Sequence, residues 1–117
     1  MVIVNKMGSI RIPDAIVATI AGYAATNCFG IKGMTACSIH DGIVRLLGSD
    51  NMHRGVKLKV NGDHADIDLH VAMQYGVNMK AVASSVMNEV KYVVERHTGV
   101  KVGRVNVYVD KISADAE

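Results

Sequence analysis

The chain has 117 residues; half are apolar, 21% are charged, and the formal net charge is +2. This is the size of one ordinary domain with enough apolar residues for a core, which excludes global disorder, and the near balance of charge requires no polyanionic partner. No stretch approaches the roughly 18 apolar residues of a membrane-spanning helix, and the N-terminal residues do not match a signal peptide. We expect one cytoplasmic domain over residues 1–117, with its core in 8–112 and with Cys28 and Cys37 reduced.

The first elements in chain order are a short strand and a helix. Alternation of residue types predicts the strand over Gly8–Ile12. Pro13 and Asp14 suit the first turn of a helix that runs to about Asn27. Its expected apolar stripe consists of Ile16, Ile20, Ala21 and Ala24.

The next segment is rich in glycine and harder to interpret. Gly30–Met34 predicts a turn and then a short extended stretch that ends near Ala36. Residues 41–47 predict a short helix between Gly42 and Gly48, with Ile43, Leu46 and Leu47 on its apolar side. Residues 48–51 are polar and predict a loop.

A β-hairpin is the firmest structural expectation. Val56, Leu58 and Val60 alternate with lysines, and Asn61-Gly62-Asp63 is a typical tight-turn sequence. The following strand alternates between an apolar face and a polar face. Its apolar face contains Ala65, Ile67, Leu69, Val71 and Met73, and its polar face contains His64, Asp66, Asp68 and His70.

A long helix and a final strand complete the chain. Asn78 is a good N-cap and Gly99 a good C-terminal stop. Between them, helical spacing is kept by Met79, Val82, Val86, Met87 or Ala83, Val90, Val93 and Val94. A strand over 102–112 and a frayed tail over 113–117 follow. We predict an α+β fold: a two-layer sandwich in which two main helices cover one face of a mixed sheet with a central β-hairpin.

Eight short segments resemble, in the same order, the alkaline shock protein family, the envelope stress-response proteins of Gram-positive bacteria. They are Gly8–Pro13, Ala21–Ala25, Cys28–Met34, Arg54–Val56, Ile67–Leu69, Tyr75-Gly76, Glu95 with Thr98-Gly99, and Val105–Val109. The resemblance covers the chain from Gly8 to about Ile112. Without charged low-complexity extensions, the chain is similar to the small subgroup often encoded beside a fatty-acid kinase of the dihydroxyacetone-kinase type.

The resemblance implies a small cytoplasmic protein, sometimes held at the membrane by a partner, with no established activity and no catalytic residues to carry over. No Ser-His-Asp, paired-carboxylate or phosphate-loop pattern is present either. We therefore expect no enzyme and no cofactor, but a general stress protein that self-associates or binds a protein partner. A role in lipid metabolism would rest only on the typical gene neighbour. The only aromatic anchors for an interface are Tyr23, Phe29, Tyr75, Tyr92 and Tyr108.

Three other candidate sites have simpler explanations beside the functional ones. His64, Asp66, Asp68 and His70 could offer metal ligands, but alternate residues on a strand lie about 6.5–7 Å apart, and a solvated strand face explains them more simply. Cys28 and Cys37 lack a reliable neighbouring base, since only His40 is near in sequence, so inert thiols are expected. The alternative function is RNA binding by a KH-like GxxG loop. Its residues would be Gly30, Lys32 and Gly33, extended by Arg54, Lys57 and Lys59.

Overall fold

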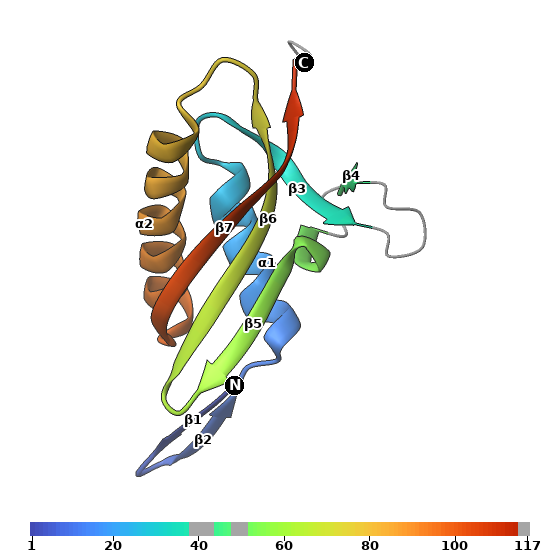
Figure 1. Ribbon diagram of the computed structural model, residues 1–117. Coiled ribbons are helices and arrows are strands. Elements are labelled where there is room, and N and C mark those ends of the chain that lie inside the picture. Colours follow the sequence, from blue (N-terminus) through green and yellow to red (C-terminus); the bar gives the residue numbers. More distant parts are fainter. Residues whose placement is uncertain (38–43, 48–51, 115–117) are drawn as a thin grey trace.

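The computed structural model describes residues 1–37, 44–47 and 52–114. Figure 1 shows two helices on one side of a twisted sheet, with a small two-stranded hairpin projecting from the end that holds the N-terminus. The strands are β1 (Val2–Asn5), β2 (Gly8–Arg11), β3 (Ile31–Cys37), β4 (Val44–Leu46), β5 (Val56–Asn61), β6 (His64–Gln74) and β7 (Lys101–Ser113). The helices are α1 (Asp14–Thr26), the short 3-10 turn η1 (Met52–Gly55) and α2 (Met79–Thr98). The predicted α+β class, with a hairpin in a mixed sheet, is confirmed.

Strand β6 is the centre of the main sheet. One of its edges pairs with β5 along residues 64–69 and with β3 along residues 71–73, both antiparallel. Its other edge pairs with β7 in parallel, which the connection through α2 permits. Strand β4 extends the sheet beyond β3. Strand β6 is therefore a central strand, and its apolar face is buried under the helices.

The β5–β6 hairpin forms as predicted. Asn61 pairs with His64, so Gly62 and Asp63 make a two-residue turn. Gly62 has φ of 61°, a left-handed conformation that favours glycine. The predicted apolar face of β6, from Ala65 to Met73, is buried throughout.

Helix α2 also begins and ends as predicted. The Asn78 side chain accepts a hydrogen bond from the Ala81 N–H at 3.0 Å, and Gly99 ends the helix with φ of 76°. The buried positions are Val82, Val86, Val90 and Val94, which repeat every four residues and face the sheet. Val93 and Ala83, the predicted alternative to Met87, are half-buried against this core, whereas Met79 and Met87 are exposed, so the predicted stripe is wrong at the two methionines.

Helix α1 packs on a face one residue away from the predicted one. Ile16 is 51% exposed and Ile20 only partly buried, whereas Val17 and Ala18 are buried with Ala21. Most of the buried face is alanine, and small side chains let α1 approach β3, β5 and α2 closely. Pro13 is the N-cap and not a residue of the first turn.

Two strands, β1 and β4, were not predicted. The predicted strand over Gly8–Ile12 is confirmed as β2, and it pairs with β1 in a separate hairpin, where Val4 lies opposite Ser9. The expected helix over residues 41–47 is wrong for Val44–Leu46, which form strand β4 opposite Thr35–Cys37. Leu47 follows β4 outside any element and is half-buried against the core. The predictions for residues 41–43, 48–51 and 115–117 fall outside the described residues.

Candidate functional site

All five aromatic side chains lie on the surface. Their exposed fractions run from 46% for Tyr108 to 82% for Phe29. The core therefore consists of Val, Ala, Ile, Leu and Met without any aromatic residue. Aromatic side chains bury large areas at low entropic cost when a partner covers them, and they are enriched in protein interfaces. The five predicted interface residues are thus accessible, but the fold distributes them over several regions.

Two of these aromatics border hollows beside the helices. An open groove of about 510 Å³ lies between α1 and α2, and its lining includes Ile20 and Tyr23 from α1 and Val93 and His97 from α2. A second hollow of about 370 Å³ lies at the start of α2. Phe29 lines it together with Val77, Asn78, Ala81, Val82 and Ser85. The lining of both hollows is mainly apolar, which suits a protein side chain more than a charged ligand.

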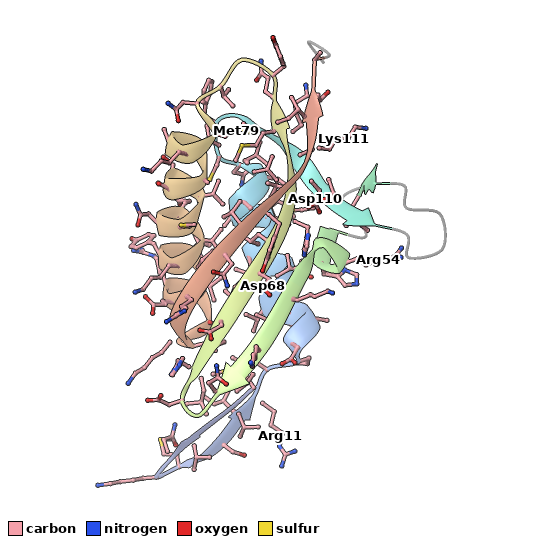
Figure 2. The ribbon with its side chains drawn as sticks, in the orientation of Figure 1. Arg11, Arg54, Asp68, Met79, Asp110 and Lys111 are labelled. Carbon is pink, nitrogen blue, oxygen red and sulfur yellow. The ribbon has the colours of Figure 1, made fainter. Side chains whose placement is uncertain are left out.

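The face of the sheet that points away from α1 is polar. Figure 2 shows Asp68 and Asp110 on this face. The Asp66 carboxylate accepts hydrogen bonds from the Asn61 side chain and the Arg104 N–H, both at 3.0 Å, and Asp68 accepts one from Asn106 at 2.8 Å. Each carboxylate thus has its own partner.

The four potential metal ligands of β6 do not converge. His64 contacts Asp63 at 3.4 Å, while His70 bonds Asp110 at 2.8 Å on the far part of the strand. Among the described residues, no group of three or more His, Cys, Asp or Glu side chains could hold an ion.

A cluster that the sequence did not predict surrounds His70. Its Nδ1 lies 2.8 Å from Asp110 Oδ2, and the buried Thr35 hydroxyl donates to the same oxygen at 3.1 Å. The imidazole also stacks on the Tyr108 ring, with centroids 4.7 Å apart. These residues come from β3, β6 and β7, so only the sheet register brings them together. Because Thr35 bonds the carboxylate and not the imidazole, the cluster lacks the nucleophile–base contact of a hydrolase triad.

The candidate RNA-binding residues lie in two places. Gly30 and Gly33 are both buried, and Gly33 and Lys32 belong to strand β3. A Cβ on Gly30 would lie 2.9 Å from Val82 Cγ2, so this glycine is required for close packing of the chain against α2. The GxxG segment is therefore part of the packed sheet and does not form a projecting loop between helices.

The basic extension of that site shares its face with acidic residues. Lys57 and Lys59 are exposed on β5, where they stand across from Asp68 and Asp66. Arg54 is exposed in η1. The neighbouring carboxylates reduce the positive potential that phosphate binding would need. RNA binding stays an untested prediction.

The structure describes the surroundings of the Cys28 thiol but not those of the Cys37 thiol. The Cys28 thiol donates to the Ala24 carbonyl at 3.3 Å. Burial, followed by the nearby Glu89 carboxylate, raises the pKa of Cys28, which lowers its reactive thiolate fraction. Cys37 is the last residue of β3, and His40 lies outside the described residues.

Within the described part of the chain, no helix combines the length and apolar character needed to cross a membrane.

Comparison with known proteins identifies a family for the chain. Residues 2–114 match the model of the alkaline shock protein 23 family, described as having a cell envelope-related function. Similar proteins include the uncharacterized protein YloU of Bacillus subtilis strain 168, with 37% identity over 92% of this chain and 91% of YloU. Another is the uncharacterized protein Spy1614 of Streptococcus pyogenes serotype M6, with 34% identity over 97% of this chain and 94% of Spy1614. The uncharacterized protein YqhY of Bacillus subtilis strain 168 is 26% identical over 97% of this chain and 83% of YqhY.

No solved structure matches the chain. The family model covers almost the whole chain, and two relatives match it at more than 30% identity over nearly their full length. The chain belongs to the alkaline shock protein 23 family, whose function is related to the cell envelope.

Proposed function

We propose that this protein acts without catalysis, through self-association or by binding a protein partner in the cell envelope response. The observation that supports this most strongly is that all five aromatic residues are exposed, so that none of them contributes to the core. A sequence free to place aromatics would gain stability by burying them, because each can bury about 150–250 Å². Keeping them outside favours a role in contacts with another molecule.

The groove between α1 and α2 is the preferred contact surface. It combines an exposed tyrosine, Tyr23, with the aliphatic side chains of Ile20 and Val93, and His97 adds a polar group to the lining. Protein interfaces likewise combine aromatic and aliphatic contact groups with polar ones. On the family resemblance alone, we also propose that a partner holds the protein at the membrane and links it to lipid metabolism.

The test combines size measurement with capture of partners. Light scattering over a wide concentration range would detect self-association, and pull-down from the native cell would detect another protein. Tyr23→Ala should weaken binding of a protein partner at the groove, whereas Met7→Ala, at an exposed residue of the β1–β2 hairpin, should leave that binding unchanged. Two results together would contradict the proposal: the protein is a strict monomer, and no captured protein is lost when Tyr23 or another exposed aromatic is replaced.

A further inference from the structure

The outer edge of β7 is open for pairing. This strand has 13 residues and, among the described strands, pairs only with β6; Figure 1 shows it in red at the border of the sheet. At its start, the Val102 N–H donates a hydrogen bond to the Glu95 carboxylate of α2 at 2.9 Å. Edge strands in natural proteins are usually short or covered, because unpaired backbone N–H and C=O groups invite another strand. Tyr108, Val109 and Ile112 are exposed along β7. A long, partly apolar edge of this kind is a candidate site for pairing with another strand.

The side chains of β7 are arranged symmetrically about Val107. If a second copy paired antiparallel with its two-fold axis at Val107, Val105 would lie opposite Val109. In the same register Val102 would lie opposite Ile112. These residues share one face of the strand, since they pair with Ala65, Ile67, Leu69, Val71 and Met73 of β6. Apolar residues would then meet apolar residues along the whole contact.

The irregularities of the strand follow the same symmetry. The β6–β7 register shifts once between the pairs Ala65–Val102 and Ile67–Val105, and again between Val71–Val109 and Ala72–Lys111. The extra residues thus fall at 103–104 and at 110, on either side of Val107. A two-fold axis at Val107 would place one irregularity opposite the other, so that facing residues still point to the same side. A β-bulge on an edge strand normally hinders pairing with another strand. Here the bulges of the two copies would face each other, so the two strands could still pair.

The charges also match in this register. Arg104 would stand opposite Asp110 on both sides of the axis. Within its own chain, Asp110 receives both of its described hydrogen bonds on Oδ2, from Thr35 and His70, which leaves Oδ1 for a guanidinium. Arg104 forms no ion pair among the described residues.

Neighbouring registers are less favourable. With the axis at Asn106, Lys101 would face Lys111, and like charges directly opposite each other are destabilising. With the axis at Tyr108, Val105 would face Lys111 and Arg104 would face Ile112. Of these three registers, the one with its axis at Val107 combines apolar pairs, opposite charges and matching irregularities.

We propose that two copies of this chain associate through antiparallel pairing of their β7 strands about Val107. The sheets then form one continuous layer, with the helices of both copies on the same face. The inference rests on the self-association part of the proposed function and assigns it a surface and a register. A single pair of strands forms a small interface, so association should be weak and concentration-dependent.

Disulfide trapping tests the register directly. In a Cys28→Ser, Cys37→Ser background, Asn106→Cys and Tyr108→Cys would face each other across the axis, about 5 Å apart between Cα atoms, whereas each would lie about 7–8 Å from its own copy. Mixing the two variants should yield a disulfide-linked dimer, and each variant alone should yield little. Lys57→Cys mixed with Lys59→Cys, on the edge strand β5, is the matched control and should not crosslink.

Charge reversal tests the ion pairs. Arg104→Glu and Asp110→Lys should each weaken self-association about tenfold, because two attractive pairs become repulsive. Mixing these two variants should restore association, since both pairs of the mixed dimer are again opposite in charge. Lys80→Glu makes the same charge change on the exposed side of α2 and should have no effect.

The outcomes separate the two proposals. Crosslinking in the mixed sample with rescue by mixed charges supports pairing about Val107. A dimer that crosslinks elsewhere, or in another register, overturns this inference and leaves self-association standing. A parent protein that stays monomeric at every concentration overturns this inference together with self-association, while binding of a different protein remains open to its own test.

Discussion

Replacing Val90 by Asp tests the packing of α2 on the sheet. The Val90 side chain is 0% exposed and belongs to the central apolar cluster with Leu69 and Val86. The variant loses burial of a valine, about 1.5–3 kcal/mol, and places an unpaired carboxyl in the core at a further cost of roughly 2–7 kcal/mol. The expected loss of at least about 4 kcal/mol is a large fraction of the roughly 5–15 kcal/mol that stabilises such a domain.

Thermal and urea unfolding followed by circular dichroism measure this loss. At about 4 °C per kcal/mol for a domain of this size, Val90→Asp should melt roughly 15 °C lower or fail to fold. Val90→Ala should lose about 2 kcal/mol, because it only leaves a small cavity. Glu89→Lys is the adjacent control and should change little, since Glu89 is exposed. If Val90→Asp melts within about 2 °C of the parent, α2 does not pack on the sheet through this face.

Three further predictions concern a cap, a glycine and a thiol. Asn78→Ala should lower the free energy of unfolding by about 1 kcal/mol in urea titration, because the α2 N-cap bond is removed; an unchanged midpoint would contradict this. Gly30→Ala should cost roughly 2 kcal/mol, since φ is 87° and the new Cβ meets Val82, and a stabilised variant would refute the packing described for this turn. Burial and Glu89 raise the pKa of Cys28, so its alkylation, followed by mass spectrometry of its peptide, should accelerate only at a higher pH than that of an exposed cysteine. Equal pH profiles would contradict this environment.

The sequence predicted the elements that local patterns determine. The β5–β6 hairpin follows from alternation and a tight turn, and α2 follows from Asn78, Gly99 and a valine every fourth residue. The buried face of α1 was misplaced by one residue, because Ile16 looked more apolar than the small residues that allow close packing. Strand β4 was missed because pairing with β3 outweighed a helix-like local pattern.

The candidate surfaces were harder to predict than the fold. Thr35, His70 and Asp110 are brought together by pairing between three strands, and no local pattern connects them. The symmetry of β7 likewise depends on where its register shifts against β6, which the sequence does not reveal. The exposure of the five aromatics became evident only when the fold showed a core built without them.

Photo-crosslinking in the native cell tests most directly whether the protein acts through contacts made by its exposed aromatic residues. A photoreactive phenylalanine derivative would replace Tyr23 in the groove between α1 and α2, and in a matched control it would replace the exposed Lys80. The proposed function predicts a discrete crosslinked species from position 23, containing a second copy or one defined protein, and little from position 80. If only the uncrosslinked monomer appears at position 23 and at the other four aromatic positions, the protein does not act through these surfaces and the proposed function is wrong.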